Sequence, residues 1–199
     1  MIKLFAFLGN YGKEYKDTRH NAGFFCAENL SLTKELSWLN KFTGEYAKAN
    51  SSYFNETLHF LKPLTYMNRS GDSIAQVVKF YKIKPNEVLV FHDELELEKA
   101  TLSLKWAGGL GGHNGLRSIK AQLGTADFWR LRVGIGRPTN EQFDISDYVL
   151  SRFTKNEIEN LQFQIPKLDK LIDEILKCEE DEALKALIPK WAKIKLMEK

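Results

Sequence analysis

The regular alternation of short apolar runs with segments of helical periodicity is the feature that most limits how this chain can fold. The apolar runs have the length and the content of β-branched and aromatic residues that are typical of strands. Six such strands are predicted, at residues 2–8, 45–50, 57–61, 87–91, 101–106 and 130–135, the second with the weakest pattern. Strands that alternate with helices favour an α/β fold, and we predict a three-layer α/β/α sandwich around a mixed, mostly parallel sheet.

Helical segments, in which apolar residues recur at one-turn spacing, separate or follow the predicted strands. They are predicted at residues 22–30, 73–81, 116–123, 158–176 and 182–188. The fourth and longest contains Pro166, which lacks an N–H donor and crowds the preceding turn. We therefore expect a break or kink there, with Pro166 at the first position of the second piece.

The composition is that of one soluble globular domain, and we predict a single domain over residues 1–199. Of the 199 residues, 43% are hydrophobic and 28% charged, enough to bury a core. No apolar stretch approaches the roughly 18 residues of a membrane span, and the apolar start is predicted to be a buried strand, not a signal peptide. Cys26 and Cys178 lie far apart without metal-ligand spacing, which favours a reducing, cytoplasmic setting. The net charge of +3 is compatible with an RNA partner but does not require one.

Polar segments stand where the predicted strands end and the predicted helices begin. Residues 9–12, 92–94 and 107–115 follow strands, and residues 19–21 and 66–68 precede helices. Ligands of open α/β sheets bind beyond the carboxyl ends of the strands. If this topology holds, the five segments meet on one rim of the sheet and form the candidate site.

His20 is the strongest candidate for acid–base chemistry among the four histidines, because it has polar neighbours on both sides and opens a helix. Histidine has the side-chain pKa nearest neutrality, which suits a general base. A carboxylate such as Asp93, at a strand end, can fix the imidazole tautomer and leave the other nitrogen free to take a proton from water. The alternatives are a capping role for His20 and a turn role for Asp93, and the residues alone do not decide between them.

The glycine-rich run at residues 108–115 lacks the spacing of a phosphate-binding loop or of a dinucleotide-binding turn. Its four closely spaced glycines predict left-handed backbone angles or the close approach of another chain. The amides of Asn10, Asn68 and Asn114 can each donate and accept hydrogen bonds, as a bound peptide backbone requires. Each of these asparagines is also a common turn or cap residue.

Other catalytic chemistries find little support in the residues. No serine lies in a G-x-S-x-G elbow, and neither cysteine has a recognisable catalytic context. A metal site formed by residues 92–94 and His113 is disfavoured, because adjacent residues of an extended segment point in opposite directions. We predict no metal and no cofactor.

Six longer motifs occur in order along the chain. They are LGNYGKEYKDTRHNAG at residues 8–23, KPLTYMNRSG at 62–71, VFHDELEL at 90–97, GGLGGHNGLRSI at 108–119, RLRVGIGRP at 130–138 and DYVL at 147–150. Together they resemble the bacterial peptidyl-tRNA hydrolase family, with similarity from residue 1 to about 153. The resemblance implies a monomeric α/β/α sandwich that cleaves, without metal, the ester between a stalled peptide and the 3′-terminal ribose of tRNA, and so recycles tRNA.

The resemblance also implies roles for individual residues. His20 matches the catalytic base, Asp93 its orienting carboxylate, and Asn10 a residue near the attacked carbonyl. Matches to substrate-binding positions are Tyr15, Tyr66, Met67, Asn68, His113 and Asn114. Positions where basic side chains could meet tRNA phosphates are Lys105, Arg132 and Arg137.

Two departures from the family pattern and two rival functions remain. Tyr11 stands where the family usually has proline, so the turn after Asn10 loses a preset φ angle. The C-terminal helices match poorly, and no site residue is assigned to them. One rival function is a non-catalytic RNA-binding protein, which would be expected to carry a more basic surface than this modest net charge indicates. The other is a metal-dependent peptidase or esterase.

Overall fold

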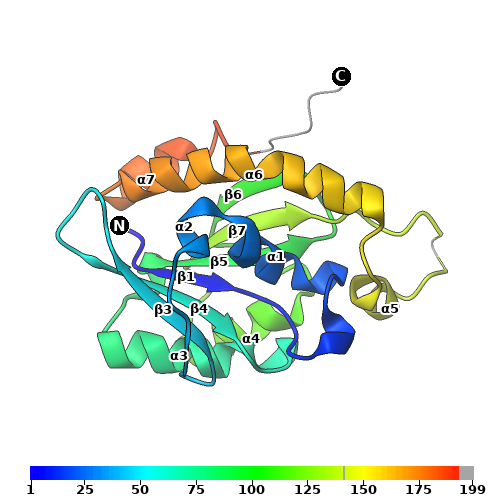
Figure 1. Ribbon diagram of the computed structural model, residues 1–199, viewed down its shortest axis with the longest axis horizontal. Helices are drawn as coiled ribbons and strands as arrows, with labels where there is room; N and C mark the ends of the chain where they lie inside the picture. The colour runs from blue at the N-terminus through cyan, green and yellow to red at the C-terminus, as the bar shows by residue number, and fades with distance from the viewer. Residues whose placement is uncertain (141, 193–199) are drawn as a thin grey trace.

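One mixed sheet forms the centre of the computed structural model, which describes residues 1–140 and 142–192 (Figure 1). Within this part the sheet has seven strands in the order β2-β3-β4-β1-β5-β7-β6. The strands are β1 (Leu4–Phe7), β2 (Leu39–Lys41), β3 (Gly44–Asn50), β4 (Thr57–Pro63), β5 (Val88–Glu94), β6 (Leu102–Trp106) and β7 (Trp129–Gly134). The last seven residues of the expected domain lie outside the described residues.

The parallel pairs lie in the middle of the sheet. β1 pairs in parallel with β4 and β5, and β5 pairs in parallel with β7. The pairs β2–β3, β3–β4 and β6–β7 are antiparallel. Five strands therefore run in one direction, and the carboxyl ends of β1 and β5 lie side by side at one edge.

Helices cover both faces of the sheet, which confirms the three-layer sandwich (Figure 1). They are α1 (Ala22–Asn29), α2 (Ser31–Lys34), α3 (Ser70–Tyr81), α4 (Asn114–Leu123), α5 (Ile145–Leu150), α6 (Lys155–Leu176) and α7 (Asp181–Leu187). Phe5 and Phe7 of β1 pack in the core shared with α1 and α6, whereas Leu4 and Ala6 pack in the core shared with α3 and α4. This alternation follows from the opposite directions of successive strand side chains. No helix among the described residues is long and apolar enough to cross a membrane.

Helix α6 is continuous across Pro166, so the predicted break was wrong. Pro166 is exposed, and so is Gln162, whose carbonyl loses its helical partner. Water can solvate that carbonyl on the outer face. On the inner face Leu161, Leu168 and Leu171, which lie on both sides of Pro166 in the sequence, are buried in the core shared with the sheet.

Two strand assignments also differ from the prediction. The edge strand β2 was missed because its three residues are all exposed and carry no apolar pattern. The turn that joins it to β3 places Phe42 and Thr43 at positive φ, without the glycine or asparagine that usually marks such a turn. Strand β5 continues through Glu94, three residues beyond the predicted end, so Asp93 belongs to the strand and is held by its pairing with β7.

Candidate active site

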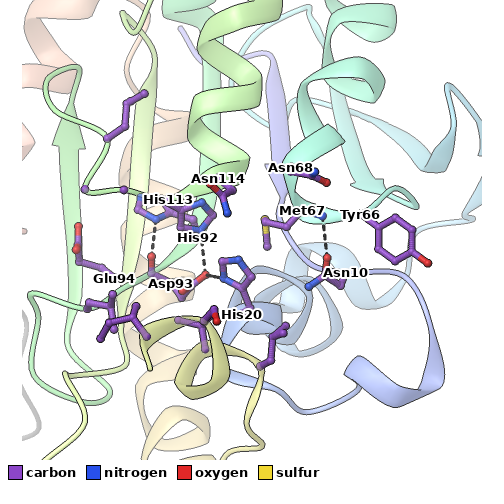
Figure 2. Close-up of a pocket in the computed structure, with 18 of the residues that line it drawn as sticks. Asn10, His20, Tyr66, Met67, Asn68, His92, Asp93, Glu94, His113 and Asn114 are labelled. Carbon is purple, nitrogen blue, oxygen red and sulfur yellow. Dashed lines mark hydrogen bonds and ion pairs between the residues drawn. The ribbon is translucent and has the colours of Figure 1, made fainter. Parts of the chain in front are cut away.

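A cavity of about 420 Å³ opens beyond the carboxyl ends of β1 and β5 (Figure 2). Its size lies within the range of small-ligand sites. All nine predicted catalytic and substrate-binding residues line it, namely Asn10, Tyr15, His20, Tyr66, Met67, Asn68, Asp93, His113 and Asn114. The five polar segments predicted to meet on one rim of the sheet therefore do meet.

His20 and Asp93 are in direct contact. His20 lies in the short 3-10 helix η2 (Arg19–Asn21) that leads into α1, and Asp93 is the penultimate residue of β5. The distance from His20 Nδ1 to Asp93 Oδ1 is 2.9 Å, and both residues are buried. Burial opposes ionisation of Asp93, but the charges and hydrogen bonds of His20 and His113 outweigh it and hold the pKa of the carboxyl well below its usual range. An ionised carboxylate only accepts, so His20 donates from Nδ1 and keeps a lone pair on Nε2.

His113 binds the same carboxylate oxygen. Its Nε2 lies 3.0 Å from Asp93 Oδ1, while its Nδ1 accepts from the backbone N–H groups of Gly115 and Leu116 at the start of α4. Because Nδ1 is an acceptor, the hydrogen of the neutral ring is on Nε2 and is donated to Asp93. Bonds made at both nitrogens thus set the tautomer of His113.

The same three side chains form the one group in the described part of the chain whose ligand atoms, all within 4.8 Å of one another, could hold a metal ion. This group differs from the metal site considered in the sequence, because it includes His20 and takes only Asp93 from residues 92–94. A metal would need the lone pair of His113 Nε2, but the single lone pair of that neutral ring is on Nδ1 and accepts the α4 N–H groups. The donor set suits a proton-transfer network better than a metal.

The histidines around Asp93 differ in protonation. Burial lowers the pKa of His20, but the charge of Asp93 and its hydrogen bond outweigh burial, so the pKa is raised. Burial and the neighbouring His113 lower the pKa of His92 well below its usual value. The Nδ1 atom of His92 bonds the backbone carbonyl of Asp93 at 2.6 Å. Burial therefore favours the neutral form of His92 behind the pair, whereas Asp93 favours the protonated form of His20.

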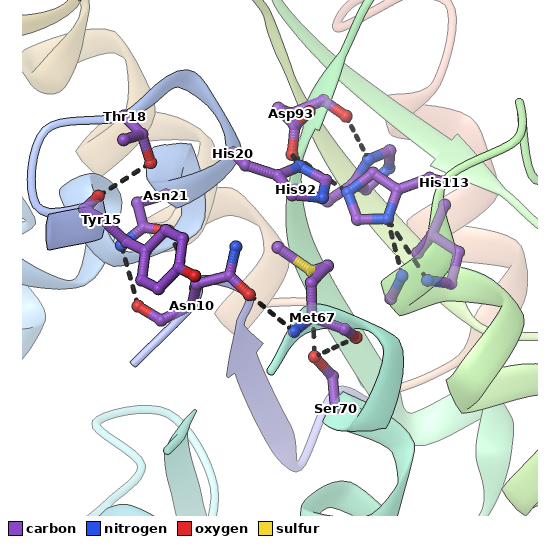
Figure 3. A network of polar contacts seen from close by, with 12 residues as sticks. Asn10, Tyr15, Thr18, His20, Asn21, Met67, Ser70, His92, Asp93 and His113 are labelled. Atoms are coloured by element: carbon purple, nitrogen blue, oxygen red, sulfur yellow. Dashed lines mark hydrogen bonds and ion pairs between the residues drawn. The ribbon is translucent and has the colours of Figure 1, made fainter. Parts of the chain in front are cut away.

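Asn10 is held from two sides (Figure 3). Its Oδ1 accepts from the backbone N–H of Met67 at 2.7 Å, which joins the loop after β1 to the 3-10 helix η3 (Met67–Arg69). The side chain of Asn21 pairs with both backbone groups of Asn10, at 2.8 and 3.1 Å. The Nδ2 group of Asn10 is thereby left for a ligand. Asn21 was not predicted as a site residue, although it stands beside His20.

Asn68 and Asn114 are exposed side chains at the starts of helices on the cavity wall (Figure 2). Asn68 lies in η3, directly before α3, and Asn114 is the first residue of α4. The Oδ1 atom of Asn114 accepts a long bond of 3.5 Å from Arg117. Both amides keep most of their hydrogen-bonding capacity for another molecule.

The basic residues lie beside the cavity, outside its lining. Lys105 of β6 pairs in register with Arg130 of β7, and Arg132 follows on the same face of β7. Arg130 was missed by the sequence reasoning, although its spacing from Arg132 was the available signal. Its guanidinium is buried and donates to the carbonyl of Gly109 in the glycine-rich loop at 2.8 Å. Burial, then Arg130 and Arg132, lower the pKa of Lys105.

Arg137 lies apart from these cations, in an exposed ion pair with Glu96. In the glycine-rich loop, Gly108, Gly111 and Gly112 have positive φ, as the glycine spacing predicted. Gly109, by contrast, has a φ outside that range.

Helix α5 supplies a wall of the cavity that was not predicted. Its lining residues are Ile145, Ser146, Val149 and Leu150. The N-cap Asp144, whose side chain accepts from the backbone N–H of Ser146, was the available signal for this helix. An apolar wall opposite the amides gives the cavity an amphipathic lining.

Comparison with known proteins decides the family. The family model described as Peptidyl-tRNA hydrolase matches residues 4–195. The chain belongs to the peptidyl-tRNA hydrolase family. A peptidyl-tRNA hydrolase of Treponema pallidum (strain Nichols) is 45% identical over 98% of this chain and 97% of its own, and one of Geobacillus thermodenitrificans (strain NG80-2) is 48% identical over 78% and 83%. The crystal structure of peptidyl-tRNA hydrolase from Acinetobacter baumannii superposes with a TM-score of 0.83 at 36% identity, covering 94% of each chain. The family similarity thus extends through the C-terminal helices, beyond residue 153.

Proposed function

We propose that this chain hydrolyses the ester bond between peptide and tRNA in peptidyl-tRNA, using water activated by His20. The observation that carries the proposal is the bond from His20 Nδ1 to the buried Asp93 carboxylate, which leaves Nε2 as a base facing the cavity. Family membership supports the choice of substrate. Products are a free peptide and a free tRNA, as tRNA recycling after interrupted translation requires.

In this mechanism His20 Nε2 takes a proton from water as the hydroxide attacks the ester carbonyl. Asp93 keeps the imidazole in the reactive tautomer and stabilises the imidazolium that forms. The protonated ring then returns its proton to the departing ribose oxygen. A general base contributes about 10²- to 10⁴-fold in rate, and an ester needs no larger single effect.

Hydrogen-bond donors around the carbonyl stabilise the negative charge that develops on its oxygen. The Nδ2 group of Asn10 suits this role, because its Oδ1 is already bound to Met67 and fixes the direction of the amide. Asn68 and Asn114 hold the main chain of the peptide through their open amides. Tyr15 and Tyr66, whose rings meet edge-on with centroids 6.5 Å apart, form the wall beside the peptide.

The tRNA phosphates contact Lys105 and Arg132, and the buried Arg130 beside them adds its positive charge to this cluster. The three cations share this region with Glu94, whose Oε2 lies 3.6 Å from Arg132 Nη1, so the cluster keeps a net positive charge that a phosphate offsets. We include Arg137 only as a weaker contact, because Glu96 already neutralises it. The substrate needs one copy of the cavity, and we propose that the chain acts as a monomer.

The test is the release of labelled peptide from an N-acylated aminoacyl-tRNA by the wild type and by His20→Ala. We expect hydrolysis by the wild type, with a kcat that falls about 10³-fold in His20→Ala because the general base is lost. His59→Gln serves as the matched control, since His59 is a buried histidine bonded to Tyr46 on the far side of the sheet. A wild type without activity, or a His20→Ala variant that keeps most of the rate, contradicts the proposal. A rate that disappears in chelator favours the metal-dependent rival.

A further inference from the structure

A buried cation directly precedes His20. Arg19 is 6% exposed, and its Nη1 donates to Ser151 Oγ at 2.6 Å and to the carbonyl of Arg152 at 2.7 Å. Its Nη2 donates to Glu157 Oε2 at 2.7 Å. A buried charge is costly unless it is paired and hydrogen-bonded, and these three bonds hold the two terminal nitrogens of Arg19 in place.

The second oxygen of Glu157 reaches another segment of the site. Lys99 Nζ lies 2.7 Å from Glu157 Oε1, and Lys99 belongs to the loop that follows Asp93 and the end of β5. Glu157 itself is only 6% exposed. One buried carboxylate therefore contacts the residue before His20 with one oxygen and the loop after Asp93 with the other.

Backbone bonds reinforce the same connection. The N–H of Arg19 donates to the carbonyl of Ser151 at 3.0 Å, and the N–H of Phe153 donates to the carbonyl of Asp17 at 2.9 Å. The segment between α5 and α6 thus runs antiparallel beside the residues that lead to His20. Figure 1 shows α5 next to this N-terminal segment. The Arg19 guanidinium also lies 4.7 Å from the ring centroid of Tyr148 in α5.

We infer that Glu157 is a positioning residue that fixes the spacing of His20 and Asp93 by binding Arg19 and Lys99 at the same time. The inference rests on the proposed function, because it assumes that the His20–Asp93 pair performs the chemistry. Misplacement of reacting groups by about 1 Å can cost about 10²-fold in rate. Lys99 is half-exposed, so its ion pair is the weaker of the two.

A purely structural role for Glu157 makes a different prediction. Glu157 Oε2 also accepts from the backbone N–H of Thr154 and so caps α6. If capping were its only function, its loss would lower stability without changing the chemical step. Glu174 is a matched control, because it anchors the other end of α6 by accepting from Lys190 at 2.6 Å and from Trp191 at 2.8 Å.

The experiment compares kcat, KM and the titration of the His20 imidazole by NMR in wild type, Glu157→Gln and Glu174→Gln. In Glu157→Gln we expect kcat to fall about 10-fold, KM to stay within twofold, and the pKa of His20 to drop as its contact with Asp93 loosens. In Glu174→Gln we expect only a lower melting temperature. A Glu157→Gln variant with the kcat and the His20 pKa of wild type overturns the inference, as does an equal loss of kcat in Glu174→Gln.

Lys99→Met provides a second variant if Glu157→Gln does not fold, because Lys99 is partly exposed and takes no part in the α6 cap. We expect its kcat to fall about threefold at unchanged KM, and a wild-type kcat overturns the inference. The His20→Ala result separates the two proposals. If His20→Ala retains activity, the proposed function fails. If His20→Ala is inactive while Glu157→Gln and Lys99→Met match wild type, only the positioning role fails.

Discussion

On one side of the cavity, around Asp93, the polar groups are buried and bonded to one another, whereas on the other side, at Asn68 and Asn114, they are exposed. Asp93 Oδ1 receives both His20 and His113, at 2.9 and 3.0 Å. The side chain of Asn68 forms no hydrogen bond within residues 1–140 and 142–192, and that of Asn114 forms a single long one to Arg117. The groups on the first side already bond one another, whereas those on the second side are open to the bonds that the proposed substrate would make.

This difference separates two physical tasks. Groups that stabilise a transition state are most effective when their orientation is fixed in advance, because no reorganisation is needed during the reaction. Groups that recognise a peptide backbone must instead offer unpaired donors and acceptors. Substitutions on the Asp93 side are therefore expected to lower kcat, and substitutions on the amide side are expected to raise KM.

Asp93→Asn tests the fixed side and should have the largest effect of the three predictions that follow. We expect kcat to fall about 10²-fold, because a neutral amide does not stabilise the imidazolium that forms on His20 and can turn its NH₂ group toward the ring in place of Oδ1. The pKa of His20 is raised by Asp93, so its removal lowers that pKa. In the proposed mechanism activity requires neutral His20 and is lost below its pKa, and the acid limb of the kcat–pH profile should therefore move to lower pH.

Glu96→Gln is the matched control for Asp93→Asn, since Glu96 is an exposed carboxylate in the loop after β5. The Glu96→Gln variant should keep the kcat of wild type and the acid limb of its kcat–pH profile. An unchanged acid limb in Asp93→Asn would remove the carboxylate from the activation of His20. A large rise in KM with little change in kcat would show that Asp93 acts in substrate binding, as proposed for Asn68 and Asn114, and not in the chemical step.

Asn68→Ala tests the open side. We expect kcat/KM to fall about 10-fold, mainly through KM, because the variant loses hydrogen bonds made only with the bound peptide. The measurement is a full kinetic series with N-acylated aminoacyl-tRNA. Asn29→Ala is the control, since Asn29 bonds the carbonyl of Phe25 within α1. A fall in kcat at constant KM would show that Asn68 acts on the chemical step and would weaken the division between the two sides.

The fold was largely predictable because the apolar patterns that define it are local. The alternation of strands and helices predicted the sandwich, and the three-residue edge strand β2 escaped because its residues are all exposed. The predicted break at Pro166 was wrong for a related reason. A local rule predicted a break, but burial of Leu161 and Leu168 on the opposite face of α6 depends on the sheet and is not visible in the chain.

The residues that line the cavity were predictable from the sequence, whereas the hydrogen bonds and ion pairs that hold them in place were not. All nine predicted catalytic and substrate-binding residues line the cavity. The segments after the parallel strands β1, β4 and β5 converge on one edge, and the loop after the antiparallel strand β6 returns to it with His113 and Asn114. The bonds of two histidines to Asp93, and the contacts of Glu157 with Arg19 and Lys99, join side chains that lie far apart in sequence. The burial of Arg130 was not predictable, because a charge inside a predicted strand gives no sign that it will be buried.

Lys105→Ala should have the smallest effect of the three and extends the comparison to the proposed phosphate-binding cluster. We expect a roughly threefold rise in KM and a shallower dependence of KM on salt, because one phosphate contact is lost. The effect stays small because Arg130 and Arg132 remain, and because removing Lys105 relieves repulsion within the cluster. Arg137→Ala is the comparison variant, since Glu96 already neutralises Arg137. Equal salt slopes in the two variants would show that the cluster of Lys105, Arg130 and Arg132 binds phosphate no better than an exposed ion pair.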